Sequence, residues 1–77
     1  MEIMPKRTNS KIQIEFGENL RRIRESKGLS LSEVSARCDV DKSNIAKVEN
    51  GQFNIQLTKI FELAKGLGIE AKELLDF

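Results

Sequence analysis

Apolar residues recur three or four positions apart along most of this 77-residue chain, and no stretch alternates polar and apolar residues for long. That spacing places side chains on one face of an α-helix, whereas a half-buried strand needs a period of two. The sequence therefore predicts an all-α fold. At this length roughly 60% of the surface of the unfolded chain is buried on folding, so the core is small and a large catalytic cleft is not expected.

The apolar periodicity and the capping residues predict five helices. Ser30 and Glu33 form a capping-box pattern at the start of the second helix. Gly28 can end the first helix, because glycine is favoured at the position just past a helix C-terminus. The first and fourth helices should each direct an apolar stripe to the core. The stripe of the first helix is Ile12, Phe16, Leu20 and Ile23, and that of the fourth is Leu57, Ile60, Phe61, Ala64 and Leu67. The expected helices cover about residues 12–27 and 31–37, a third that begins after Asp41 and ends at Asn50 and Gly51, and then about residues 56–66 and 70–76.

The third helix follows the second after only about three residues. Asp41 is a good N-cap, and Asn50 and Gly51 can adopt the left-handed conformation that ends a helix. A turn this short makes the two helices cross at a steep angle, which is the helix-turn-helix arrangement.

The outward face of the third helix is polar and carries no large apolar side chain. On a helical wheel it presents Ser43, Ala46, Lys47 and Asn50, with Lys42 and Asn44 on its flanks. Cations, amides and small residues suit the major groove of DNA, where lysine can donate to guanine and asparagine can pair with adenine. Any surface helix is polar outside, however, so this face alone does not establish DNA binding.

The charge and the cysteine content indicate the cellular compartment of the protein rather than its function. The net charge is +1, and residues 1–51 carry ten Lys/Arg against eight Asp/Glu, a slight excess that an ordinary solvated surface also shows. The single cysteine, Cys38, cannot form an internal disulfide, which favours a reducing compartment. The chain has neither a secretory h-region nor the run of ~20 apolar residues that spans a bilayer, so we expect a cytoplasmic protein without a membrane partner.

Residues 1–10 are expected to form a flexible arm ahead of a domain over residues 11–77. This part of the sequence is basic, since Lys6, Arg7 and the neighbouring Lys11 outnumber the single acidic residue Glu2. Such an arm could follow the DNA backbone or could serve as a solubilising tail.

Three segments in order carry a resemblance that covers the chain from about Phe16 to Phe77. They are "FGENLRRIRESKGLSLSEVS", "VDKSNIAKVENG" and "NIQLTKIFELAKGLGIEAKELL". In their order and spacing they resemble the phage repressor and Cro-like helix-turn-helix family, also called the Xre family. Within that family the sequence looks most similar to the small controller proteins of restriction-modification systems and to short single-domain repressors. The resemblance implies a compact five-helix repressor-like domain.

The resemblance also implies site residues. It implies that Lys42, Ser43, Asn44 and Lys47 contact DNA bases. It implies that Ser30, Asn50, Gln52 and Asn54 contact DNA phosphates. It pairs Arg24 with Glu49, which the wheel independently places only about 70° from the core direction. A homodimer contact would involve the last helices, where the candidates are Ile69, Ala71, Leu74, Leu75 and Phe77, although the same residues could form the core of a monomer.

Two departures from the family pattern bear on the site. Leu31 replaces the usual glutamine, so the family's side-chain contact to phosphate is not expected there, although the backbone N–H at that helix start could still serve. Asp39 stands where the turn usually has glycine, and aspartate tolerates the left-handed region better than most residues.

An enzyme is not expected, because the chain has no histidine, no Gly-rich phosphate loop and no spaced metal-ligand set. Cys38 suits a core position better than a nucleophile, and no cofactor or metal is implied. We therefore expect a sequence-specific transcriptional regulator that binds double-stranded DNA as a homodimer, regulates its own promoter, and blocks RNA polymerase or contacts it. The alternative is a protein-interaction module, such as an antitoxin-like partner with little DNA specificity.

Overall fold

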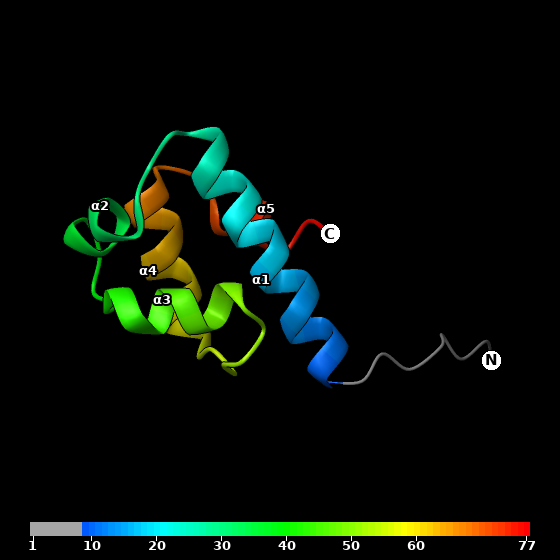
Figure 1. Cartoon of the computed structure of the whole chain (residues 1–77). Helices are drawn as coiled ribbons and strands as arrows, with labels where there is room; N and C mark the ends of the chain where they lie inside the picture. The colour runs from blue at the N-terminus through cyan, green and yellow to red at the C-terminus, as the bar shows by residue number, and fades with distance from the viewer. Residues whose placement is uncertain (1–8) are drawn as a thin grey trace.

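The computed structural model describes residues 9–77 and confirms the all-α prediction, since these residues form helices and connecting segments without any strand (Figure 1). The helices are α1 (Asn9–Ser26), α2 (Leu31–Ala36), α3 (Lys42–Glu49), α4 (Leu57–Leu67) and α5 (Ala71–Leu74). Asn9 and Ser10, expected in the arm, belong to the first turn of α1. Lys6 and Arg7 lie outside the described residues, so a contact between the arm and DNA stays a prediction.

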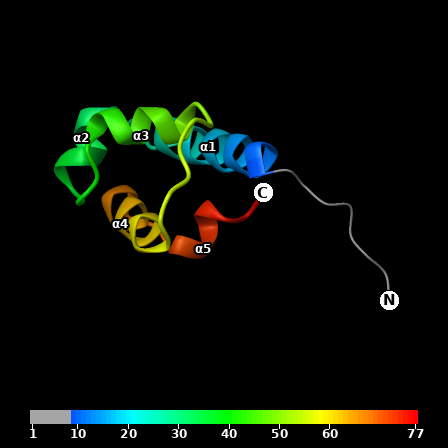
Figure 2. The ribbon, with the colours of Figure 1, turned by 90° about the horizontal axis from the view of Figure 1, so that it is seen from below.

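The helices form two layers around one core. Seen from below, α1 and α3 lie together on one side and α4 and α5 on the other (Figure 2). Helix α2 packs against both α3 and α4, so it closes one end of the core. The largest fully buried side chains come from all five helices, and they are Leu20, Val34, Ile45, Val48, Leu63 and Leu74.

Most helix ends follow the chemistry expected of them. The Ser30 hydroxyl accepts from the Glu33 N–H at 3.0 Å, and the Glu33 carboxylate accepts from the Ser30 N–H at 2.8 Å. Gly28 and Gly51 have φ of 68° and 73°. Asn50 was expected to share the left-handed conformation but has φ −87°, because Gly51 alone makes the turn. Asp41 occupies the N-cap of α3 without accepting a side-chain hydrogen bond.

The turn between α2 and α3 is fixed from α4 and not by a left-handed residue. Asp39 has negative φ, which corrects the expectation that it uses the left-handed region. Its N–H donates to Glu62 Oε1 at 2.9 Å, and its carbonyl accepts from Lys59 Nζ at 2.8 Å. Two side chains of α4 therefore satisfy the backbone polar groups of this turn.

Three apolar residues predicted to face the core are exposed instead. Leu57 and Phe61 on α4 keep 67% and 60% of their surface, and Ile12 on α1 keeps 41%. Leu57 and Phe61 lie one turn apart, on a side of α4 that neighbouring helices do not cover, and Ile12 lies in the N-terminal part of α1. Helical spacing identifies an apolar face but not what covers it.

Within residues 9–77, no helix is both long enough and apolar enough to cross a membrane.

Candidate nucleic-acid interface

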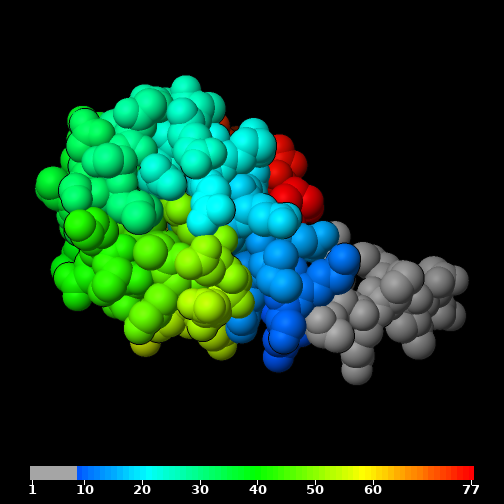
Figure 3. Space-filling view, in the orientation of Figure 1, coloured from blue at the N-terminus to red at the C-terminus, as the bar shows by residue number. Residues whose placement is uncertain are grey.

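The outward face of α3 is open to solvent. Lys42, Ser43 and Lys47 are exposed, and Ala46 between them is half-buried. On the opposite face, Ile45 and Val48 keep 0% and 1% of their surface. In the space-filling view the residues around α3 form part of the visible surface (Figure 3). The helix thus presents its polar side outward along its whole length.

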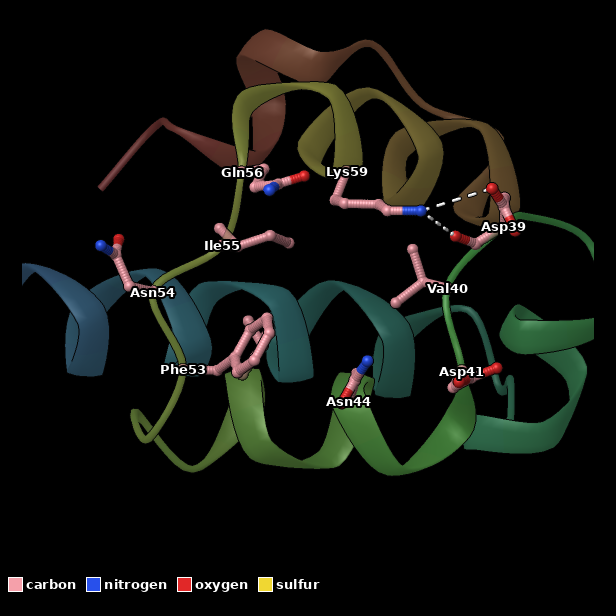
Figure 4. A pocket seen from close by; sticks show the side chains of 10 residues that line it. Asp39, Val40, Asp41, Asn44, Phe53, Asn54, Ile55, Gln56 and Lys59 are labelled. Carbon is pink, nitrogen blue, oxygen red and sulfur yellow. Dashed lines mark hydrogen bonds and ion pairs between the residues drawn. The ribbon is translucent and has the colours of Figure 1, made fainter.

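Asn44 takes a different direction from the other predicted base-reading residues. It is half-buried and lines a cavity of about 340 Å³ between α3, the segment after it, and α4. In Figure 4 its side chain points from α3 toward the α4 side, below the Lys59–Asp39 ion pair. Asn44 therefore lies at the edge of the outward face, whereas Ser43 and Lys47 lie on it.

The position of α3 depends on a buried ion pair with α1. The Glu49 side chain is 2% exposed and accepts from Arg24 Nε at 2.6 Å and from Arg24 Nη2 at 3.0 Å. Arg24 Nη1 also donates to the Leu29 carbonyl at 2.8 Å. The hydrogen bond to Glu49 raises the pKa of Arg24, against the opposing effect of burial. The predicted Arg24–Glu49 pair is present, with the two-pronged geometry that fixes orientation as well as distance.

Helices α1 and α3 approach each other closely at Gly17. A Cβ atom at this position would lie 2.1 Å from the carbonyl oxygen of Val48 and 2.8 Å from that of Glu49. The missing side chain lets the backbone of α1 lie against the last turn of α3, next to the Arg24–Glu49 pair.

Arg21 is a residue of the site that sequence reasoning missed. Its Nε donates to Glu49 Oε1 at 3.3 Å, and its Nη2 donates to Asn50 Oδ1 at 2.9 Å. Its side chain is 47% exposed, so it lies at the rim where α1 meets the end of α3. A signal was available in the sequence, because Arg21 precedes Arg24 by three positions and shares its helix face.

The four predicted phosphate-binding residues lie at two places. Asn50, Gln52 and Asn54 are exposed in the segment that begins at the C-cap of α3, and Asn54 also lines the cavity beside Asn44. Ser30 is exposed at the start of α2, where the capping box already uses its N–H. Its hydroxyl is engaged in the same capping box with Glu33.

The predicted dimer residues separate into core and surface. Leu74 is fully buried and belongs to the core, so its assignment to the dimer contact was wrong. Ile69 and Ala71 are partly buried against the same core. Leu75 and Phe77 keep 51% and 42% of their surface.

Leu75 and Phe77 border a shallow groove. Its volume is about 170 Å³, and the exposed Ile12 and Phe53 also line it. Phe77 contacts the ring of Phe16 edge-on, with the ring centroids 6.3 Å apart, so the chain end lies against α1.

The described residues offer little for metal or nucleophile chemistry. Residues 9–77 contain no group of three His, Cys, Asp or Glu side chains that could hold a metal ion. Cys38 is partly buried, and its thiol lies 3.3 Å from the Val34 carbonyl. Burial raises the pKa of this thiol, which lowers its fraction of reactive thiolate.

Comparisons with known proteins agree with this geometry. The HTH_3 helix-turn-helix family matches residues 20–74. The control protein C.BamHI of Bacillus amyloliquefaciens is 37% identical over 67 residues, which cover 86% of this chain and 83% of the relative. The crystal structure of the restriction-modification controller protein C.AhdI from Aeromonas hydrophila is 40% identical with a TM-score of 0.77, covering 80% of this chain and 94% of that one.

A more distant structure shows the same fold. It is the tetramer of the controller protein C.Esp1396I in complex with its natural 35 base-pair operator, with a TM-score of 0.73 and 19% identity over 84% of this chain and 96% of that one. The named relatives are regulatory proteins and not enzymes.

Proposed function

This chain belongs to the HTH_3 helix-turn-helix family of transcriptional regulators, and from that premise we propose that it binds an operator in double-stranded DNA with α3 in the major groove. The observation that carries the proposal is the combination of an exposed polar face on α3 with a buried ion pair behind it. A helix that is held rigidly from behind can bring side chains to base edges without ordering its backbone on binding.

The roles of the side chains follow from their positions. Lys42, Ser43 and Lys47 face outward and would contact bases, while Asn44 would reach bases only from the edge of the helix. The predicted phosphate contacts would set the register of the protein on the duplex. These are Ser30, Asn50, Gln52 and Asn54. Contacts of this kind position a protein, whereas base contacts specify the sequence.

One α3 helix covers too few base pairs for useful specificity, so we propose a homodimer on a two-fold-symmetric operator. Two recognition helices about 34 Å apart would enter successive major grooves. The contact would use the exposed apolar residues Leu75, Phe77, Ile12 and Phe53, which border one groove, in place of the buried Leu74. Exposed apolar side chains that gather in one place are typical of association surfaces.

Regulation would come from protein concentration and cooperative binding. Related controller proteins support this proposal, since one of them occupies its natural operator as a tetramer. We propose that the protein acts in the cytoplasm on its own promoter, where the bound dimer either blocks RNA polymerase or contacts it.

The test is selection of bound duplexes from a random pool, followed by measurement of affinity for the enriched duplex. We expect a two-fold-symmetric site. Lys47→Ala should weaken binding to it by roughly 5- to 150-fold, the range for loss of one specific base contact. Lys72→Ala on α5 removes the same charge away from α3 and serves as the control. A pool that stays random would refute DNA recognition and favour the alternative, a protein-interaction module.

A further inference from the structure

The end of α3 carries a contact between α1 and the candidate phosphate-binding residue Asn50. Arg21 Nη2 lies 2.9 Å from Asn50 Oδ1, and Arg21 Nε lies 3.3 Å from Glu49 Oε1. Resting on the proposed function, we infer that Arg21 is a positioning residue for DNA binding, which holds the Asn50 amide with its N–H groups directed to a DNA phosphate.

The chemistry of the two groups fixes the orientation of the amide. A guanidinium group only donates hydrogen bonds, so the Asn50 atom that faces Arg21 must be the oxygen. The Asn50 nitrogen, with its two hydrogens, is then directed away from Arg21. Asn50 follows Ser43 and Lys47 at helical spacing on the outward face, and it is exposed. Asn50 thus keeps two donors on an exposed residue of the face that the proposal places against DNA.

The charges at this end of α3 also require Arg21. The C-terminus of a helix carries a partial negative charge, and the Glu49 carboxylate lies beside it, so a phosphate would otherwise be repelled. Arg24 is 13% exposed and neutralises Glu49 through two hydrogen bonds. Arg21 is then a second, half-exposed cation at the same carboxylate, so Arg21, Arg24 and Glu49 together carry a formal charge of +1 next to Asn50, while the exposed Glu25 carboxylate lies 4.0 Å from Arg24 Nη2.

Arg22 provides a matched control on the same helix. It is exposed and has the same charge, but it bonds to the side chain of Asn19, whose own amide donates to the carbonyls of Glu73 and Leu74. Arg22 thus contacts the α5 side of α1, whereas Arg21 contacts α3. Replacement of either arginine by methionine removes one cation and keeps most of the aliphatic stem.

The experiment measures dissociation constants by fluorescence anisotropy for the parent, Arg21→Met, Arg22→Met, Asn50→Ala and the Arg21→Met/Asn50→Ala double variant. The probes are the selected duplex and an unrelated duplex of equal length, each at two salt concentrations. Thermal melting of each variant sets a temperature at which all of them are folded, so that affinity is compared between folded proteins only.

We expect Arg21→Met and Asn50→Ala each to weaken binding by about tenfold, on both duplexes alike, as loss of a phosphate contact does. Arg22→Met should change affinity by about twofold or less, because an exposed charge away from the DNA is screened. The double variant should bind several-fold more tightly than two independent losses predict, since both changes remove one contact. Arg21→Lys, which keeps the charge, should recover part of the affinity.

Two results would overturn the inference. Equal affinities of Arg21→Met and Arg22→Met would show that only charge matters, and independent losses for Arg21 and Asn50 would show that neither acts through the other. If Lys47→Ala still weakens binding in either case, the proposed function stands and only the role of Arg21 is wrong. A parent protein that binds no duplex would refute both.

Discussion

Replacement of Gly17 by alanine should destabilise this protein, although the same change in an exposed helix is stabilising. In a helix interior alanine is favoured over glycine by about 1 kcal/mol. Here the new Cβ would lie 2.1 Å from the Val48 carbonyl oxygen, and contacts below 3.0 Å essentially never occur. Helices α1 and α3 would have to separate until this distance exceeds 3.0 Å.

The cost of that separation can be bounded from general values. Overpacking a well-packed contact costs typically 1–3 kcal/mol, and the upper end applies because both close atoms at Gly17 belong to the backbone of α3. After the gain in helix propensity, we expect a net loss of about 2 kcal/mol in the free energy of unfolding. For a domain of this size that lowers the melting temperature by about 8–16 °C.

Thermal and urea unfolding, followed by circular dichroism, would measure the effect. Gly66→Ala is the matched control, since its Cβ would lie 3.0 Å from the Val34 carbonyl oxygen and 3.2 Å from the Cys38 side chain. The clash there is smaller and one of the neighbours is a side chain, so we expect a smaller loss. If Gly17→Ala melts at or above the temperature of the parent, the close approach of α1 and α3 is not required and the reasoning is wrong.

Three further predictions concern charged and ionisable groups. Arg24→Ala should lower the free energy of unfolding by about 3 kcal/mol, because it leaves the buried Glu49 carboxylate with one weaker partner. Arg37→Ala, an exposed control, should change the free energy of unfolding by less than about 0.5 kcal/mol. Equal melting temperatures for Arg24→Ala and the parent would exclude a stabilising pair. Hydrogen bonds from the capping box lower the pKa of Glu33, so its contribution to stability is complete above the pKa of the unfolded chain and is lost as pH falls through the folded-state pKa. Urea titrations should thus show a smaller acid-side loss for Glu33→Gln than for the parent. Burial raises the pKa of Cys38, so alkylation of the folded protein should reach half its maximal rate at a higher pH than in the urea-unfolded chain, and identical pH profiles would contradict this.

The periodic apolar pattern and the caps were sufficient to predict the helices, because both depend on local sequence. The Ser30 capping box and the turn at Gly51 involve residues within three or four positions of each other. The Arg24–Glu49 pair was predicted from the family resemblance, and the helical wheel supported it by placing the Glu49 carboxylate near the core side, where such a group needs a partner.

What the sequence did not predict depends on contacts between distant segments. Leu57 and Phe61 have the spacing of core residues, but whether a helix covers them is decided by the packing of the whole chain. Asp39 is held by Lys59 and Glu62, twenty or more positions away, so its local conformation could not be inferred from turn propensity. The contacts of Arg21 were missed although it shares a helix face with Arg24, because no turn or cap pattern links it to its partners 28 and 29 residues further along.

Three outward residues of α3 take no part in the contacts that hold the domain together. The side chains of Lys42, Ser43 and Lys47 form no hydrogen bond or ion pair with any other residue in 9–77. Exposed positions without such contacts tolerate substitution within about 0.5 kcal/mol. In the proposed function these three positions contact bases, so substitutions there would change the target sequence while each alters the free energy of unfolding by no more than about 0.5 kcal/mol. Duplicated copies of such a gene could then diverge in specificity without passing through an unfolded intermediate.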